Sequence, residues 1–285
     1  MDNQLQIFEQ HRPLLFSIAY RMLGSVMEAE DAVQETYLRY IATDAEAIQS
    51  PKAFLSTITT RLCLDQLKSA RVTREEYFGP WLPEPLLTAD APDELLARHE
   101  SIAMAFLLLL ETLSPIERAV FLLREVFDYD YGMIATIVDK SEANCRQLHS
   151  RAKKHVHSGR PRFVPSPQEQ QQLVTKLVTA MQQGDSDAFA ALLAQDVELR
   201  SDGGGKASAA TKPLHGREIV ARFLFGLFTK RPPHTTIDII EANGAPAFVV
   251  RIGGQVDHVT TFAMADGQIN AIHIVRNPEK LRHWQ

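Results

Sequence analysis

The sequence is poor in cysteine and lacks a long apolar run. Its 285 residues include only two cysteines, Cys63 and Cys145, and both lie within helical apolar patterns. This placement indicates buried thiols in a reducing compartment and argues against a disulfide scaffold or a metal site. The longest apolar stretch, residues 102–110, is far shorter than the roughly 20 residues of a membrane-spanning helix. Acidic residues precede the first apolar ones, so we expect no signal peptide and a cytoplasmic protein.

The charge is unevenly spread along an otherwise ordinary composition. A hydrophobic content of 45% and a charged content of 23% are typical of a folded globular protein, and the net charge is −5. Residues 140–160 nevertheless hold six bases against one acid. Such a local basic stripe favours contact with a polyanion, although a solvated helix face has the same composition.

Helical periodicity dominates the first 157 residues. Apolar spacing predicts helices over residues 5–23, with an interruption near Pro13, over 27–41, and from Ser50-Pro51 onward. Four prolines then fall within residues 79–93, which predicts an extended linker. Its Trp81, Leu82, Leu86 and Leu87 require a surface on which to dock. Helical periodicity resumes at residue 93.

The remainder of the chain mixes helical and alternating patterns. Helices are predicted over residues 170–181, 186–193 and 216–228. Four β-rich runs follow, separated by turn signals such as Asn243-Gly244, over residues 236–241, 247–252, 255–263 and 269–275. We therefore expect an α+β domain with an antiparallel sheet.

A helix-turn-helix pattern occupies residues 128–155. A short helix over 131–138 precedes a turn in which Asp139 must adopt the left-handed conformation, and Ser141 then caps a helix that runs to about residue 155. Cys145, Leu148 and Ala152 form the buried face of that second helix. Arginine suits guanine edges, asparagine and glutamine suit adenine, and lysine and serine reach phosphates. The outward side chains therefore predict a DNA contact, with two packed helices and a solvated basic face as the alternative; they are Ser141, Asn144, Arg146, Gln147, Ser150, Arg151, Lys153 and Lys154.

These motifs resemble the extracytoplasmic-function σ factors of bacterial RNA polymerase. The resemblance rests on "EAEDAVQETYLRY" (28–40), "PKAFLSTITTRLCLDQLKSAR" (51–71) and residues 113–156. It implies that residues 1–76 are σ region 2, 77–99 a linker, and 100–160 the region 4 that reads the −35 element. It further implies polymerase contacts through Asp31, Gln34, Glu35, Leu38 and Arg39. The −10 element would be contacted by Arg61, Asp65, Lys68, Ser69 and Arg71, and the loop 43–49 would capture a flipped base. Positions 59–61 read Thr-Thr-Arg, which departs from many members and leaves the promoter sequence open.

The extension over residues 168–285 resembles the SnoaL-like branch of the nuclear-transport-factor-like fold, a cone with an apolar cavity. The motifs "WLPEP" (81–85), "DGGGK" (202–206) and "NPEKL" (277–281) match σ factors that carry this domain. The resemblance implies control in cis, with no separate anti-σ factor. The chain would be a monomer when free, bind the β and β′ subunits and promoter DNA, and need no cofactor. The implied regulatory interface comprises Trp81, Leu82, Pro83, Asp202, Gly203, Gly204, Gly205, Lys206, Asn277, Pro278, Lys280 and Leu281.

Other functions are open for the extension. Asp202, His258 and His273 fall on or beside predicted strands, so a cavity enzyme or a small-ligand sensor is an alternative. Asp257 and His258 are sequence neighbours and are expected on opposite sheet faces, which argues against a catalytic pair and for a role other than an enzyme. A stand-alone enzyme and a plain repressor are rival readings of the whole chain.

The triple glycine after Asp202 is not a phosphate-binding loop. A P-loop needs a glycine, then four residues, then Gly-Lys-Ser/Thr, but Arg200 stands at the first glycine position and Ala207 follows Lys206. We expect a strand end that lets backbone pass close to another surface, with a flexible hairpin tip as the alternative. We further expect the C-terminal cone to clamp the linker and thereby to hold the two DNA-binding domains in an inactive arrangement.

Overall fold

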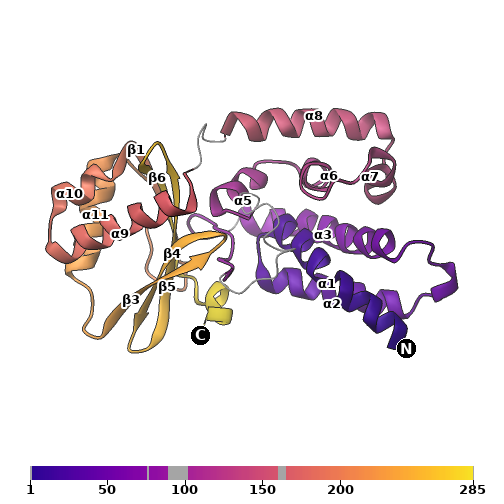
Figure 1. Cartoon of the computed structure of the whole chain (residues 1–285), viewed down its shortest axis with the longest axis horizontal. Helices are drawn as coiled ribbons and strands as arrows, with labels where there is room; N and C mark the ends of the chain where they lie inside the picture. The colour runs from indigo at the N-terminus through magenta and orange to yellow at the C-terminus, as the bar shows by residue number, and fades with distance from the viewer. Residues whose placement is uncertain (1, 76, 89–101, 160–164, 285) are drawn as a thin grey trace. The chain divides into compact units, whose positions relative to one another are not determined.

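The structure, a computed structural model, describes residues 2–75, 77–88, 102–159 and 165–284. The chain divides into two units (Figure 1). The first contains residues 1–76, 91–102 and 106–160, and the second contains 77–90, 103–105 and 161–285. The proline-rich segment after residue 76 thus groups with the C-terminal part of the chain. No helix in the described ranges is long and apolar enough to cross a membrane.

Three helices open the first unit: α1 (Asp2–Leu23), α2 (Val26–Ile41) and α3 (Pro51–Glu75). The predicted interruption at Pro13 is wrong, because α1 continues through it. Phe8 and Leu15, on either side of the proline, are buried in one core with Val33 of α2. This shared packing holds both halves of α1 in one helix although proline removes a backbone hydrogen bond.

Four further helices among the described residues belong wholly or mainly to the first unit: α5 (Met104–Glu111), α6 (Pro115–Glu125), α7 (Tyr131–Val138) and α8 (Glu142–Gly159). A capping box begins α6, in which Ser114 and Glu117 satisfy each other's backbone amides. Asp139 ends α7 at φ 54° and ψ 57°, which confirms the left-handed turn expected there. The two cysteines are buried and free, as the apolar spacing predicted.

The helix α3 packs against the α6–α7 region within the first unit. The Ser56 hydroxyl lies 2.6 Å from that of Tyr129 in a buried hydrogen bond. Arg118, which is 3% exposed, donates to the Met22 carbonyl at 2.6 Å and pairs with Glu111. Buried polar groups without such partners would be strongly destabilising, so these contacts define a specific arrangement of the helices.

The second unit is a six-stranded sheet with helices on one face. Its helices are α9 (Pro167–Gln183), α10 (Ser186–Ala191) and α11 (Arg217–Thr229), and the chain ends in the short helix η3 (Pro278–Trp284). The strands are β1 (Leu193–Asp202), β2 (Leu214–His215), β3 (Thr235–Ala242), β4 (Ala245–Ile252), β5 (Gln255–Ala265) and β6 (Gln268–Val275). Their spatial order is β2-β1-β6-β5-β4-β3.

One strand pairing corrects the expected antiparallel sheet. The neighbours β1 and β6 are parallel, while β3 to β6 form an antiparallel meander. A parallel pair needs a long crossover, and here the chain between them includes α11 and the four strands β2 to β5. Leu199 of β1, Phe248 of β4 and Ile272 of β6 lie in one core with residues of α9 and α11. The expected class, helical domains followed by an α+β domain, is confirmed.

Candidate nucleic-acid interface and linker clamp

The turn before α8 is built as a helix-turn-helix requires. Ser141 accepts a hydrogen bond from the Asn144 amide at 3.2 Å, as its predicted capping role demands. Cys145, Ala152 and Val156 are fully buried on the inner face of α8. Leu148, predicted on this face, is only half-buried. The opposite face is therefore free to meet a ligand.

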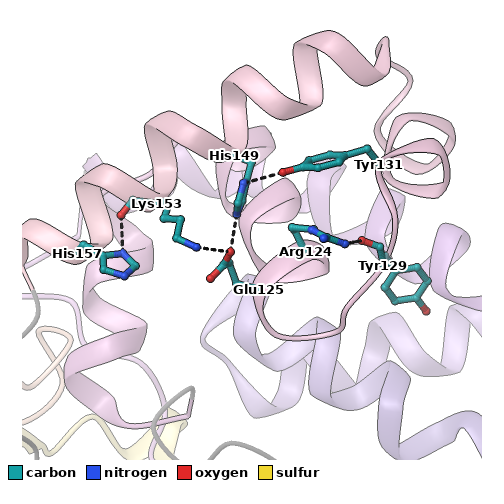
Figure 2. A network of polar contacts seen from close by, with 7 residues as sticks. All are labelled: Arg124, Glu125, Tyr129, Tyr131, His149, Lys153 and His157. Atoms are coloured by element: carbon teal, nitrogen blue, oxygen red, sulfur yellow. Dashed lines mark hydrogen bonds and ion pairs between the residues drawn. The ribbon is translucent and has the colours of Figure 1, made fainter.

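A polar network fixes the middle of α8 to α6 and α7 (Figure 2). His149 bonds to the Tyr131 hydroxyl at 2.9 Å through Nδ1 and to Glu125 at 2.8 Å through Nε2. Lys153 donates to the same Glu125 oxygen at 2.9 Å. Burial raises the pKa of Glu125, but the hydrogen bonds from Lys153 and His149 outweigh it and leave that pKa below its usual value. The carboxylate thus anchors α8 in its ionised form.

Arg146 is held in place before any ligand arrives. Its guanidinium donates to Glu142 at 2.6 Å, one helical turn away, and lies 4.9 Å from the centre of the Tyr131 ring. A guanidinium group that is already oriented loses less conformational entropy when it binds the edge of a guanine base. Tyr131 thereby connects the oriented arginine to His149.

The predicted −35 residues share the outward face of α8, with two qualifications. Asn144 is half-buried, and Lys153 is bound to Glu125 rather than free. Arg151 lies 4.0 Å from Glu117, a distance at which an exposed pair contributes little. The exposed members of the set are Ser141, Arg146, Gln147, Ser150, Arg151, Lys153 and Lys154.

The predicted −10 residues on α3 do not form one free surface. Arg61 donates to the carbonyls of Ile137 at 3.0 Å and Thr136 at 2.8 Å, at the end of α7. Lys68 pairs with Asp65 at 2.8 Å on an exposed face. Ser69 bonds back to carbonyls of its own helix, and the side chain of Arg71 lies outside the described residues. The helix-turn-helix therefore already binds Arg61, the first residue of the predicted −10 set.

The predicted polymerase-binding residues lie along one exposed side of α2. Asp31, Gln34, Leu38 and Arg39 are exposed, and Glu35 is half-buried and bonds to Arg39 at 2.7 Å. Leu38 is 56% exposed and Ile41 44%, which places apolar area among charges, as in a protein-binding surface. The loop that follows contains a short turn of helix, η1 (Ala45–Ala47), with no buried residue.

In the second unit, Asp202 binds the linker. Its side chain, fully buried at the end of β1, accepts from the Tyr77 hydroxyl at 2.6 Å and from the Leu82 amide at 2.9 Å. Lys280 of η3 reaches the same carboxylate at 2.8 Å, donates to the Leu82 carbonyl and lies 4.2 Å from the Trp81 ring centre. We call the set Tyr77, Trp81, Leu82, Asp202, Asn277 and Lys280 the linker clamp.

Asn277 closes the clamp from the other side. Its side chain donates to the Tyr77 hydroxyl at 2.9 Å, and its backbone amide donates to the Asp202 carbonyl, also at 2.9 Å. Burial and the bond to Asp202 raise the pKa of Tyr77 above its usual value, so the phenol is a donor at neutral pH. Lys206 pairs with Glu279 at the surface nearby.

The triple glycine allows this close approach. Gly204 has φ +57°, and a Cβ built on it would lie 2.8 Å from the Tyr77 hydroxyl and closer still to Asn277. A Cβ on Gly205 would lie 3.5 Å from Phe78. The prediction of a strand end that passes close to another surface is confirmed, and that surface is the linker. Pro83 and Leu281 are buried, while Gly203 packs against Ala209.

The linker then continues along the β3–β4 turn. The Asn243 amide donates to the Leu86 carbonyl at 2.8 Å, and its side chain accepts from the Leu86 amide at 3.0 Å. Thr88 bonds to Glu241 through both backbone and side chain. The Trp284 indole donates to the Pro85 carbonyl at 3.0 Å. Sequence patterns missed Tyr77 and Asn243, because their partners lie more than a hundred residues away.

Asp257 and His258 depart from their predicted placement on opposite faces. Asp257 accepts from His258 Nδ1 at 2.6 Å and from Arg276 with both oxygens at 2.9 Å. The register of β4 and β5 shifts here, so that Val250 faces His258 and Arg251 faces Val256. This bulge breaks the alternation of side chains and corrects the expectation. Among the described residues, no cluster of three or more His, Cys, Asp or Glu is arranged to hold a metal ion.

Comparison with known proteins agrees with this geometry. The Sigma-70 region 2 family matches residues 7–73, and the Sigma-70 region 4 family matches residues 103–156. The ECF RNA polymerase sigma factor SigJ of Mycobacterium tuberculosis is 36% identical over 96% of this chain and 91% of its own length. The probable ECF sigma factor SigI of the same species is 27% identical over 95% and 92%.

A solved structure extends the likeness to the whole chain. The crystal structure of Mycobacterium tuberculosis SigJ superposes with a TM-score of 0.81, covers 98% of each chain and is 33% identical in sequence. The likeness includes the second unit as well as the helices of the first. The chain therefore belongs to the extracytoplasmic-function σ factors, which direct RNA polymerase to promoter DNA.

Proposed function

We propose that the C-terminal domain controls this σ factor in cis by holding the linker between its two promoter-reading regions. The observation that carries the proposal is Asp202, a buried carboxylate that accepts hydrogen bonds from Tyr77 and Leu82 of the linker. A buried charge with three donors is strongly oriented, and leaving it without them is costly, which favours joint loss of its linker contacts. The clamp is thus a two-state element.

The clamp limits how far regions 2 and 4 separate. A free linker of residues 77–99 spans at most about 80 Å, whereas residues 89–99 alone span at most about 40 Å. A σ factor has to meet the −10 and −35 elements together, so a shorter tether disfavours the productive arrangement. Arg61 supports the same closed state, because its guanidinium is engaged by the Thr136 and Ile137 carbonyls instead of DNA. Release of the linker shifts the population toward the open state.

We further propose a partner for each exposed surface of the first unit. The exposed side of α2 contacts the β and β′ subunits through Asp31, Gln34, Glu35, Leu38 and Arg39. The outward face of α8 reads the −35 element, and α3 contacts the −10 element once region 4 has moved away. We infer a monomer when free, acting in the cytoplasm with polymerase and without a separate anti-σ factor.

Reconstituted transcription tests the control in cis. Core polymerase would be combined with the full-length chain or with a chain truncated after residue 165, on the DNA upstream of the protein's own gene. We expect the truncated chain to give more transcript per bound holoenzyme. Equal transcription from both chains would contradict inhibition by the domain. Loss of transcription would show instead that the domain assists polymerase binding.

A further inference from the structure

The second unit contains a partly open cavity that the clamp does not use. Its volume is about 110 Å³, and it lies between the inner face of the sheet and the helices α9 and α11. Phe248, Phe262, Ile272 and Leu224 are among its mainly apolar walls. An apolar cavity of about 150 Å³ is known to accommodate a benzene ring. This cavity is smaller but open on one side, so a single ring is the largest ligand body that suits it.

One wall of the cavity carries an oriented histidine. His258 lines the cavity, and its Nδ1 donates to Asp257 at 2.6 Å. Hydrogen bonds from His258 and Arg276 outweigh burial and lower the pKa of Asp257 to about 2, so this carboxylate stays ionised. With Nδ1 committed as a donor, the neutral ring offers Nε2 as an acceptor. Among the described residues, none hydrogen-bonds to Nε2.

The charges around the cavity select the ligand. Arg231 is the fixed positive charge among the sixteen described residues of the lining, and none of those sixteen is acidic. A cation would therefore meet Arg231 without an acidic side chain in the lining to offset it, whereas the carboxylate of an acid meets Arg231 and the proton of that acid meets the acceptor Nε2 of His258.

We propose that this cavity binds a small weak acid, of the size of one aromatic ring bearing a carboxyl group, with His258 and Arg231 holding the acidic end. A carboxylic acid transfers its proton to His258 Nε2 and becomes a carboxylate. The imidazolium then lies between two carboxylates, that of the ligand and that of Asp257. If the ring is already protonated, the incoming carboxylate forms the same ion pair.

A series of hydrogen bonds connects His258 to the linker clamp. Asp257 binds Arg276, whose backbone amide donates to the Asp202 carbonyl at 2.7 Å. The next residue, Asn277, holds Tyr77. A charge introduced at His258 is thus two side chains from the strand end that carries the clamp. The effect on transcription, unlike the binding itself, rests on the proposed control in cis.

Calorimetry on the full-length chain tests the binding, with benzoate, toluene and benzylamine as probes of one size and different charge. We expect saturable binding of benzoate, weaker binding of toluene and no binding of benzylamine. His258→Phe and Arg231→Gln should each weaken benzoate about tenfold, which is the scale of one hydrogen bond to a charged group. Toluene should bind both variants within about twofold of the original chain.

Matched variants separate the site from general effects. His215→Phe on the exposed strand β2 and Arg222→Gln on α11 change the same residue types outside the cavity lining, and should leave benzoate binding unchanged. Absence of benzoate binding, or equal affinity in His258→Phe and the original chain, would overturn the site. A thermal unfolding profile identical to that of the original chain would verify that each variant is folded.

Transcription with and without benzoate tests the link to the clamp. We expect benzoate to change the transcript yield of the full-length chain, and to have no effect on the chain truncated after residue 165. Benzoate that binds without changing the yield, while Asp202→Asn does change it, would overturn the coupling and leave the control in cis standing. If neither benzoate nor Asp202→Asn alters transcription, the control in cis itself is contradicted.

Discussion

The ammonium group of Lys280 lies 2.8 Å from the carboxylate of Asp202, and both side chains are buried, at 9% and 0% exposure. Removing one charge of such a pair leaves the other buried without compensation, which typically costs about 3–5 kcal/mol. Asp202→Asn, which keeps the shape, should therefore lower the unfolding free energy of the second unit by about 3 kcal/mol and raise transcription. Urea unfolding and reconstituted transcription would measure both. Glu279→Gln removes an exposed partner of Lys206 instead, and should change neither.

Gly204 and Gly253 provide a matched pair for the clamp. Their φ angles are +57° and +58°, so alanine adds a similar backbone strain at either position. Only at Gly204 does the added Cβ collide, with Asn277 and the Tyr77 hydroxyl, whereas Gly253 has nothing within 4 Å. Gly204→Ala should thus increase transcription and expose the linker to proteolysis near residue 81. Gly253→Ala should lower stability by about 1 kcal/mol without either effect. Equal behaviour of the two variants would show that the close approach has no role.

Arg61 tests the closed state of the first unit. Two hydrogen bonds from a charged donor to the end of α7 contribute roughly 1.5–3 kcal/mol each, so Arg61→Ala should raise the fraction of chains in which α3 and α7 have separated. Hydrogen exchange of the α7 amides should become faster. Lys68→Ala, on the exposed side of α3, is the control. A DNA-binding assay alone would be ambiguous, because Arg61 is also a proposed −10 contact. Unchanged exchange in Arg61→Ala would contradict the closed state.

Two substitutions of Tyr131 distinguish its ring contact with Arg146 from its hydrogen bond to His149. Tyr131→Phe keeps the ring beneath Arg146 but removes the hydrogen bond to His149, and Tyr131→Ala removes both. A partly exposed cation–π contact contributes about 0.5–1 kcal/mol, so alanine should weaken −35 binding by the holoenzyme several-fold more than phenylalanine. Fluorescence anisotropy with a −35 duplex would measure the difference. If phenylalanine weakens binding as much as alanine, the His149 bond and not the orientation of Arg146 is decisive.

Sequence patterns predict the local features of this molecule and miss its distant pairings. The capping role of Ser141 and the left-handed Asp139 follow from spacing and backbone preference within a few residues. The Asp202 motif was expected at a strand end, but its hydroxyl partner Tyr77 lies 125 residues away. Periodicity reports which face of an element is apolar, and it carries no information on which element covers that face.

The incorrect predictions have the same origin. The bulge that brings Asp257 to His258 depends on register with β4, and the engagement of Arg61 depends on the position of α7. Both are properties of tertiary packing that override the alternation of strands or the amphipathic pattern of a helix. The inward position of His149 could have been predicted from the sequence, because this residue lies four positions after the buried Cys145 and three before Ala152 on the inner side of α8.

His273 makes the second unit sensitive to acid. It is 4% exposed on β6, its Nδ1 has no hydrogen-bond partner among the residues that the structure describes, and burial, aided by the charge of Arg200, lowers its pKa from 6.5 to about 4. The unfolded chain therefore binds a proton that the folded chain does not, and stability falls as the pH drops from about 6.5 to about 4. One pKa unit corresponds to about 1.4 kcal/mol, so the loss approaches about 3 kcal/mol. His273→Leu should abolish this part of the pH dependence in urea unfolding at pH 7 and pH 5, whereas His215→Leu at an exposed position should retain it. The same slope in His273→Leu as in the original chain would assign the acid sensitivity to other groups.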